Sequence, residues 1–370
     1  MVNSLHTRIA RRIKALREGR GFSQQELAAE LGFNDRQTLA AIEAGDRRVS
    51  PAELARAAEL MGVDVEHFTD AFRLAGEGEF SFRARDVEPA VLDDFAEKAG
   101  RWIATYRELG AQSGVQPSRL GHKLELTRTS SFEDAQSCAE EIRQRWRLGD
   151  VPAAALEEAI QRELQALVLY VDAPVGVSGA ASQLPGLNTI LVNRHEPQGR
   201  RSYDLGHELF HVLTWDAMPP PRVEWEVKPT KGNRVEMLAE NFAAALLMPA
   251  ATLQERWRAR GEGDVREWLK TTARALRVSV LALQWRMHNL GYLSKADVAG
   301  LATDRAAAPS EPAGAAPVPP LFSAEFVSRV HAAVEAGRLS LRRAARLLDM
   351  DPDEFSDLCA AYGLALSYDA

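Results

Sequence analysis

Hydrophobic residues recur at helical spacing through the first 70 positions, in short runs that end at glycines. Ile9, Ile13 and Leu16 are three or four residues apart, which places them on one face of a helix. Ser23 and Glu26 have the spacing of a capping box at the start of the next helix. Two further stretches, "RQTLAAIEAG" and "SPAELARAAELMGVD", each combine a helical run with a following glycine. The pattern therefore predicts four or five short helices before about residue 72.

The pattern changes in the middle of the chain, where helical runs give way to strand-like runs. Residues 131–149 and 152–164 have helical periodicity, and Ser131 is placed to cap the first of these helices. Two β-rich runs, "ALVLYVD" and "GLNTILVN", follow between turns that contain glycine and proline. A helix that contains "DLGHELFHVLTW" comes next. We therefore predict an α+β region with a small sheet.

The last hundred residues again have mainly helical patterns. Residues 265–294 indicate two helices around a turn at "RVSV", and the Pro/Ala-rich segment 304–320 indicates a disordered linker. The whole pattern predicts a multidomain, mainly α protein: an all-α N-terminal domain, a central α+β domain with a small sheet, and C-terminal helical units. The expected pieces are an N-terminal helical domain (1–75), a helical connector (76–130), the α+β domain (131–253), a helical extension (254–302), the linker (303–320) and a small helical unit (321–370).

Composition narrows the class of protein further. The chain has 370 residues, enough for two or three domains, and 46% of them are hydrophobic. No run of about 18 apolar residues is present, so we expect no membrane span. The only cysteines, Cys138 and Cys359, exclude a disulfide scaffold and indicate a reducing cytoplasm. The net charge of −7 means that any contact with nucleic acid depends on a local basic patch.

The N-terminal helices resemble a known DNA-binding domain. The stretches "SQQELAAELG", "RQTLAAIEAG" and "VSPAELARAAELMGVD" resemble the helix-turn-helix domain of XRE/Cro-type repressors, over about 65 residues. In that family the second helix of the motif reads base edges in the major groove. The resemblance therefore implies that the DNA-facing residues are Asn34, Arg36, Gln37 and Thr38. Arginine suits guanine edges, and glutamine suits adenine edges.

Charge counting leaves a second interpretation open for this domain. Residues 1–70 hold ten Lys/Arg against eleven Asp/Glu, a net charge of about −1. A dedicated DNA-binding domain normally has a basic footprint, because phosphate contacts dominate its affinity. Six of the ten basic residues fall within the first twenty positions, which keeps a local patch available. The domain therefore either binds DNA or is a helix-turn-helix retained for docking to proteins.

The central region contains a metal-binding pattern in the sequence "HELFH". His207 and His211 are four residues apart, so both imidazoles project from one face of a helix and can take two corners of a zinc tetrahedron. Glu208 lies one position further and can act as a general base. The alternative is an amphipathic helix whose two histidines are satisfied by other contacts.

A second helix downstream, "NRVEMLAENFAAALLMP", supplies candidate carboxylates. Glu236 and Glu240 are four residues apart on a mostly apolar helix, where buried, unpaired acids would be unfavourable. Glu236 can coordinate zinc, and Glu240 can accept a ring N–H from a ligand histidine. A solvated acidic face is the alternative.

The two blocks together resemble one enzyme family. "RRSYDLGHELFHVLTW" followed by "EMLAENFAAALLMP" is similar to the ImmA/IrrE metallopeptidases, over roughly residues 130–250. The resemblance implies a zincin-like fold, with His207, His211 and Glu236 on Zn²⁺ and Glu208 as catalytic base. The family usually has Asn or Asp where this chain has Glu240, which leaves the role of Glu240 behind the zinc ligands in doubt. Residues 265–294 resemble the helical extension that follows the catalytic part.

This resemblance implies a cytoplasmic zinc endopeptidase that cleaves a protein. The substrate it implies is a helix-turn-helix repressor of the XRE type, whose cleavage relieves repression in a stress or defence response. The alternative is a DNA-binding transcriptional regulator whose peptidase-like region senses or binds a partner without proteolysis. The presence of all three ligands and the base favours the enzyme.

Several other residues of the central region are weaker candidates. Cys138 lies in the same region and could cap the open zinc position as a thiolate, although a small buried side chain is the simpler interpretation. The segment Asn188–Asn193 is a candidate edge strand for an extended substrate, with an ordinary sheet strand as the alternative. Tyr203 and His195 flank the "HELFH" helix, and we expect structural roles for both.

Overall fold

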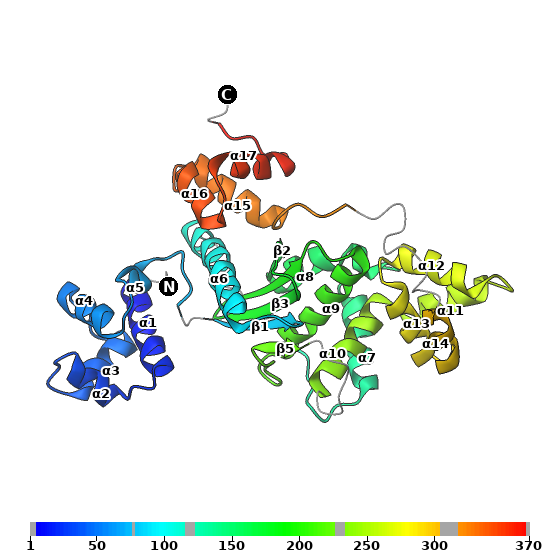
Figure 1. The fold of residues 1–370 in the computed structure, drawn as a ribbon, viewed down its shortest axis with the longest axis horizontal. Helices are drawn as coiled ribbons and strands as arrows, with labels where there is room; N and C mark the ends of the chain where they lie inside the picture. Colours follow the sequence, from blue (N-terminus) through cyan, green and yellow to red (C-terminus); the bar gives the residue numbers. More distant parts are fainter. Residues whose placement is uncertain (1–4, 76–77, 115–122, 226–233, 304–316, 368–370) are drawn as a thin grey trace. The chain divides into compact units, whose positions relative to one another are not determined.

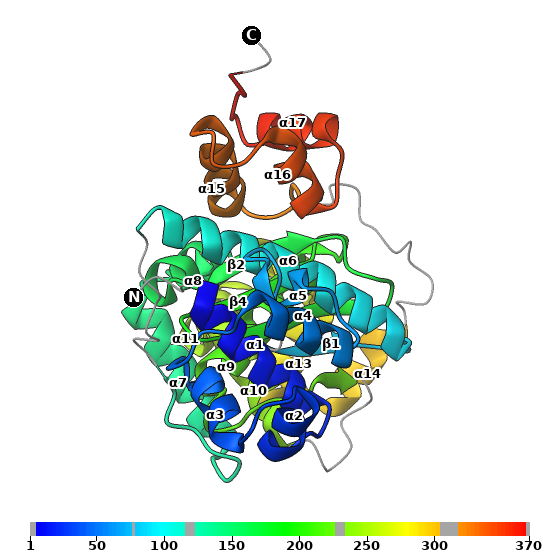
Figure 2. The ribbon, with the colours of Figure 1, turned by 90° about the vertical axis from the view of Figure 1, so that its left-hand side faces the viewer.

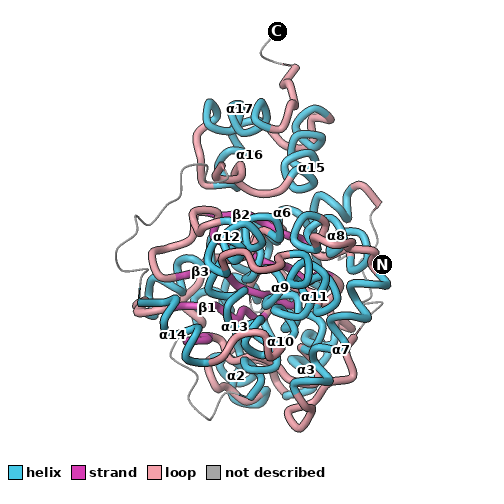
Figure 3. Tube along the Cα trace, turned by 90° about the vertical axis from the view of Figure 1, so that its right-hand side faces the viewer, coloured by secondary structure: helices cyan, strands magenta, loops and turns pink. Residues whose placement is uncertain are grey.

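The computed structural model describes residues 5–75, 78–114, 123–225, 234–303 and 317–367 (Figure 1). The chain folds into two compact units, each described by itself below. Unit 1 comprises Met1–Glu79, Asp93–Pro117 and Val327–Ala370, and unit 2 comprises Phe80–Leu92 and Ser118–Phe326. Helices make up most of the described chain, and the strands gather in one region (Figure 3).

Unit 1 contains the helix-turn-helix domain. Its helices are α1 (Leu5–Gly19), α2 (Gln24–Glu30), α3 (Arg36–Ala44), α4 (Pro51–Leu60) and α5 (Glu66–Thr69). Ser23 with Glu26 forms the predicted capping box of α2, and Ser50 forms another at α4. Gly45 ends α3 in the left-handed region at φ 83°, a conformation that favours glycine. The predicted four or five short helices are confirmed.

Two buried arginines hold the first helix in place. Arg17 Nε donates to Glu43 Oε1 at 2.6 Å, which ties α1 to α3. Arg12 is fully buried and donates to the carbonyl oxygens of His67 at 2.9 Å and Asp70 at 2.8 Å. Both side chains meet the requirement that a buried charge be paired or hydrogen-bonded. Much of the positive charge of α1 is therefore structural.

The C-terminal helical segment belongs to the same unit. Its helices α15 (Ala324–Glu335), α16 (Leu341–Leu348) and α17 (Pro352–Ala361) form a three-helix group (Figure 2). They contact α6 (Pro89–Gln112): Lys98 pairs with Asp349 at 2.6 Å, and the Arg329 guanidinium lies 3.7 Å from the centre of the Tyr106 ring. The C-terminal segment thus packs within unit 1. The expected linker at 304–320 falls outside the described residues up to position 316.

Unit 2 is built on a five-stranded mixed sheet in the order β2-β4-β3-β1-β5. The strands are β1 (Glu79–Ala84), β2 (Leu167–Val171), β3 (Val177–Leu184), β4 (Leu187–Asn193) and β5 (Val223–Trp225). β3 and β4 pair antiparallel as a hairpin, whereas β2 pairs parallel with β4 and β1 pairs parallel with β5.

The structure adds to one expectation and overturns another. The segment 76–130, expected to be a helical connector, contains the helix α6 but also contributes β1, because the alternation in "EFSFRA" suits a strand better than a helix. The segment Asn188–Asn193 is not an edge strand: β4 lies between β2 and β3, and all its residues are buried. The two edge strands of the sheet are β2 and β5, and β5 pairs with β1.

Unit 2 also contains helices, and one of them, packed against the sheet, carries the "HELFH" motif. They are α7 (Phe132–Arg145), α8 (Leu156–Leu164), α9 (Gln198–Thr214), α10 (Arg234–Leu247), α11 (Ala250–Ala259), α12 (Val265–Leu276), α13 (Val280–Asn289) and α14 (Lys295–Thr303), with a single 3₁₀ turn at Pro152–Ala154. Figure 1 shows α9 against the sheet with α10 beside it; α9 packs on β3, β4 and α10. The N-terminus of α9 closely approaches the turn before α13: a Cβ on Gly199 would lie 2.5 Å from the Ser279 nitrogen. None of the helices in the described ranges is long and apolar enough to cross a bilayer.

Candidate metal centre

Helix α9 places two imidazoles side by side in the interior of unit 2. His207 and His211 are both buried, and their Nε2 atoms are 3.1 Å apart. The spacing of four residues puts them on one face of the helix, as the sequence predicts. Glu208, the next residue after His207, is also buried.

Helix α10 brings the predicted carboxylate to the same point. Glu236 Oε2 lies 3.2 Å from His207 Nε2, and Glu236 Oε1 lies 3.6 Å from His211 Nε2. Since α10 packs on α9, the two motif blocks meet although His211 and Glu236 are 25 positions apart in the sequence. The structure thus brings together the three expected ligands.

A fourth group, Glu224, was not expected. It lies in β5 with its Oε1 3.2 Å from His211 Nε2 and its Oε2 3.6 Å from His207 Nε2. One ligand atom from each of His207, His211, Glu224 and Glu236 can be chosen so that all four lie within 4.8 Å of one another. The alternation of "VEWEV" indicates a short strand, and this is the only sequence feature that could have placed Glu224 opposite its apolar neighbours.

These donor atoms fit a small divalent cation. Zn–N and Zn–O bonds of about 2.0–2.1 Å imply donor–donor separations of about 3.4 Å around a tetrahedron. The shortest His–His, His207–Glu236 and His211–Glu224 separations are 3.1, 3.2 and 3.2 Å. Two imidazoles with two carboxylates are a donor set that suits zinc. The structure therefore has a candidate Zn²⁺ site.

The electrostatics of this cluster also favour a cation. Burial lowers the pKa of His211 to about 3, with the neighbouring His207 adding to this, and burial lowers the pKa of His207 as well. Burial raises the pKa of Glu208 and Glu224 well above the usual carboxyl value, although Arg83 opposes it for both groups. A bound divalent cation would offset the burial of these carboxylates and would coordinate neutral imidazoles.

Comparisons with known families now bear on this geometry. A helix-turn-helix family model matches residues 13–68, and a peptidase-family model described as an IrrE N-terminal-like domain matches residues 162–288. The chain joins an XRE-type helix-turn-helix domain to an IrrE-like domain. Both resemblances found in the sequence are thereby confirmed, as is the mainly helical fold with a small sheet.

The chain has little similarity to individual known proteins. No curated protein matches the chain. Two solved structures are of the competence regulator ComR from Streptococcus vestibularis, one in complex with its cognate signaling peptide XIP and one in the apo form. They are 12% identical, cover 97% and 98% of this chain and 100% of theirs, and superpose with a TM-score of 0.17. A TM-score this low supports no conclusion about the IrrE-like domain.

Charged residues form a buried ion-pair group in the IrrE-like domain, near the metal cluster, which comprises the candidate ligands His207, His211, Glu224 and Glu236. Arg83 from β1 lies 3.3 Å from Asp204 Oδ1, and Arg200 Nε donates to Asp204 Oδ2 at 3.1 Å. Asp204 precedes Glu208 by one helical turn, and Arg83 faces Glu224 across the β1–β5 pair. Arg83 was not expected here, because β1 was not predicted as a strand.

A glycine of β3, Gly179, lies beside Glu208. A Cβ on Gly179 would be in ordinary contact with Glu208 Oε1 at 3.7 Å, and in tight contact with the Leu191 carbonyl oxygen at 3.1 Å. Among the described residues, Glu208 Oε1 has no hydrogen-bond partner. The carboxylate expected to be catalytic is therefore buried next to the metal cluster, and one of its oxygens makes no hydrogen bond with the described residues.

Glu240 is not joined to either histidine by any hydrogen bond in the described part of the IrrE-like domain. Its main-chain oxygen accepts a hydrogen bond from the Tyr203 hydroxyl at 3.1 Å. Burial raises the pKa of the half-buried Glu240 carboxyl, with Arg83 opposing this. The Nδ1 atoms of His207 and His211 have no partner among the described residues. The suggested support of a ligand histidine by Glu240 remains a prediction.

The structure does not bring Cys138 to the metal cluster. Cys138 lies on α7, half-buried against the hydrophobic core, and burial raises the pKa of its thiol. A protonated thiol in this position is a small apolar side chain, so the suggested zinc-capping role was wrong. His195 is exposed, with its Nε2 2.6 Å from Asp172 Oδ1, and Tyr203 packs against the core. Both fit the structural roles expected of them.

The residues proposed to face DNA lie at the start of α3 in unit 1. Asn34, Arg36 and Gln37 are exposed, and Thr38 is partly exposed. Asp35 caps the helix by accepting from the Thr38 main-chain nitrogen at 2.8 Å and from its hydroxyl at 3.1 Å. The Thr38 hydroxyl is therefore already hydrogen-bonded to the capping residue. Arg36 and Gln37 are the more available of the four for contacts with bases.

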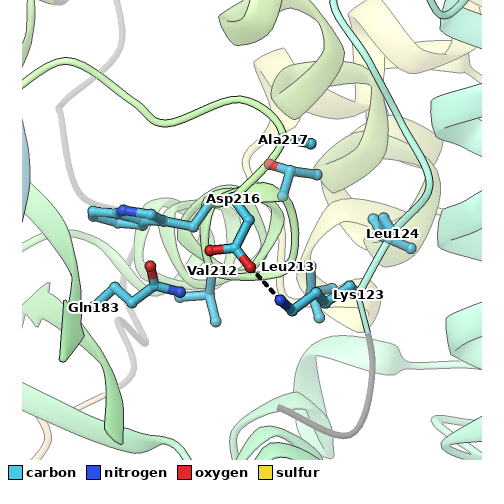
Figure 4. Close-up of a pocket in the computed structure, with 9 residues that line it drawn as sticks. Lys123, Leu124, Gln183, Val212, Leu213, Asp216 and Ala217 are labelled. Atoms are coloured by element: carbon cyan, nitrogen blue, oxygen red, sulfur yellow. Dashed lines mark hydrogen bonds and ion pairs between the residues drawn. The ribbon is translucent and has the colours of Figure 1, made fainter. Parts of the chain in front are cut away.

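A small pocket lies beyond the other end of α9 (Figure 4). Its lining includes Leu213 and Trp215, and two other lining residues, Lys123 and Asp216, form an ion pair. Its volume of about 50 Å³ would hold one or two waters. None of the four metal-cluster residues lines it, so it is separate from the site of the IrrE-like domain.

Proposed function

We propose that the chain is a zinc-dependent endopeptidase that cleaves a protein, and that its substrate is a helix-turn-helix repressor of the XRE type. The observation that carries this proposal is the convergence of His207, His211 and Glu236, with buried Glu208 beside them. Relief of repression in a stress or defence response would be the result of cleavage.

Each residue has a defined part in this proposal. His207, His211 and Glu236 would hold Zn²⁺, which when bound supplies Lewis-acid polarisation of the scissile carbonyl and a more acidic water. Glu208 takes a proton from the attacking water and later delivers it to the leaving amine. The raised pKa of Glu208 suits a group that carries a proton between these two partners.

The helix-turn-helix domain has a supporting role in this proposal. Exposed Arg36 and Gln37 would bring the protein to DNA, where a repressor is bound. The acidic balance of the domain weakens non-specific attraction to DNA, so base contacts would have to contribute more of the affinity. A cytoplasmic location is part of the same proposal.

The test is cleavage of repressors encoded near the gene by wild type, Glu208→Gln and the matched control Glu255→Gln. Glu255 is exposed on α11 and tests whether loss of any carboxylate matters. We expect wild type and Glu255→Gln to cleave one repressor, and Glu208→Gln to cleave it about 10²–10⁴-fold more slowly while keeping its zinc. Equal cleavage by Glu208→Gln would refute its catalytic role. Binding of zinc and DNA without cleavage under any inducing condition would favour the non-proteolytic regulator.

A further inference from the structure

Strand β5 makes two kinds of contact that a bound peptide would make. Through its backbone it extends the sheet in parallel to β1, with Val223 opposite Phe82 and Glu224 opposite Arg83. The Phe82 nitrogen donates to the Arg222 carbonyl oxygen at 2.9 Å. Extended peptides commonly bind proteins by adding a strand to a sheet edge in this way. β5 therefore occupies the edge of β1 that an extended substrate could otherwise use.

The side chain of the same strand reaches the metal cluster. Glu224 is 4% exposed, and its carboxylate lies 3.2 Å from His211 Nε2. With Glu236 and the two histidines, it completes a set of four protein donors. Structural zinc sites have four protein ligands, whereas catalytic sites have three and leave one position for water or substrate. The described arrangement is thus that of a closed site.

We propose that residues 222–225 are an internal inhibitor in which Glu224 blocks the metal position needed for catalysis. This inference rests on the proposed function and concerns its regulation. The open, active form requires the Glu224 carboxylate to leave the cluster, while His207, His211 and Glu236 retain the metal. Cys138 was the sequence-based candidate for such a block, and the structure gives that position to Glu224 instead.

β5 is a short edge strand, so it can separate from β1 without disrupting the rest of the sheet. Within the described residues, β5 spans three positions and lies at the end of the strand order, so its departure breaks pairing with β1 alone. Short edge segments of this kind are where local opening is least unfavourable. Ser81 Oγ lies 3.3 Å from Glu224 Oε1 but only 2.7 Å from the Pro221 carbonyl oxygen. The hydroxyl proton is therefore directed mainly at the backbone just before β5, and the main partners of the Glu224 carboxylate are the metal-site residues.

The other three donors differ from Glu224 in this respect. His207 and His211 lie within the 17-residue helix α9, and Glu236 lies in α10, which packs on both α7 and α9. Moving the backbone of either helix would disturb the core. Among the four, Glu224 is the donor whose withdrawal disturbs the least packed structure.

The test compares wild type with Glu224→Ala and Glu224→Gln, with Glu255→Gln as the exposed control and Glu236→Ala as the variant that lacks a permanent ligand. Three quantities are measured on the full chain: zinc affinity by chelator competition, the visible spectrum of the cobalt-substituted protein, and the affinity of acetohydroxamate for the zinc-loaded protein. Acetohydroxamate is a small chelator that needs an accessible metal position. Cleavage of the repressor is a fourth, separate measurement.

If Glu224 blocks the site, both Glu224 variants retain zinc, change the cobalt spectrum and bind acetohydroxamate more tightly. An open state populated at about 10% or less in wild type predicts a gain of about tenfold or more. Cleavage by Glu224→Ala should rise by the same factor. Glu236→Ala should instead lose most of its zinc affinity, and Glu255→Gln should behave as wild type.

Two results would overturn the inference. If Glu224→Ala loses zinc as severely as Glu236→Ala, Glu224 is a permanent ligand and not a removable block. If the cobalt spectrum and acetohydroxamate affinity are unchanged in both Glu224 variants, Glu224 does not occupy the metal position. A result in which no variant cleaves any repressor, yet acetohydroxamate binds more tightly to Glu224→Ala, would remove the proposed function and leave the block standing.

Discussion

Removing zinc should change how the stability of unit 2 depends on pH. Without a cation, burial raises the pKa of Glu208 and Glu224 in the folded protein. A carboxyl with a raised pKa binds its proton more tightly when folded. The free energy of unfolding of the metal-free protein therefore falls as pH rises above about 4.5, until the raised pKa is passed. Each such group contributes about 1.4 kcal/mol per pH unit.

The two histidines act in the opposite direction over a different range. Burial lowers the pKa of His207 and His211, the latter to about 3, so the unfolded chain binds protons more tightly below about 6.5. Their contribution makes stability rise with pH up to that point and then levels off. Between pH 4.5 and 6.5 the two effects oppose each other. Above pH 6.5 the histidine contribution is constant, so any further loss of stability of the metal-free protein as pH rises comes from the carboxyl groups.

Zinc should reverse this trend, because its ligands bind it in their deprotonated forms. Free zinc at one hundred times its Kd would add about 2.7 kcal/mol. We would measure urea unfolding, followed by tryptophan fluorescence, at several pH values between 6.5 and 8.5, with excess zinc or with chelator. We expect the difference between the two curves to widen with pH. A constant difference, or greater stability of the metal-free protein at higher pH, would refute the reasoning.

Three further predictions concern other parts of the chain. Gly199→Ala should destabilise unit 2 by about 1–3 kcal/mol in urea unfolding, because the added Cβ would clash with the backbone at Ser279. The control Gly300→Ala in α14 should be neutral or stabilising. Equal effects of the two substitutions would contradict the close packing at Gly199. Arg83→Met should destabilise unit 2 by about 3 kcal/mol, because it weakens the compensation of the fully buried Asp204, and unchanged unfolding would show that Arg200 suffices. Arg36→Ala should weaken binding to DNA from upstream of the gene by about 1–3 kcal/mol in fluorescence anisotropy, and unchanged binding would favour protein docking.

The features that sequence could predict are those with local causes. A capping box such as Ser23 with Glu26 depends on only a few neighbouring residues, and so does the spacing of His207 and His211. Glu236 could be placed because it follows in a second recognisable helix, and the family resemblance supplied its role. These predictions needed no knowledge of how distant strands pair.

The features that sequence missed depend on pairing between distant segments. β1 and β5 are about 140 residues apart, and only their parallel pairing brings Ser81 and Arg83 next to Glu224. A three-residue strand also has too short an alternation to stand out from its surroundings. The suggestion for Cys138 rested only on its place in the same domain, which does not bring a side chain to the site. Its position on α7 directs it to the core.

The measurement that tests the central claim most directly is zinc stoichiometry. Wild type, His211→Ala and the exposed control Glu255→Gln would be dialysed against limiting free zinc, and bound metal counted by atomic emission. The account predicts one zinc per chain for wild type and Glu255→Gln, and none retained by His211→Ala under the same conditions. Equal zinc in wild type and His211→Ala, or no zinc in wild type, would contradict the claim that this cluster is a metal centre.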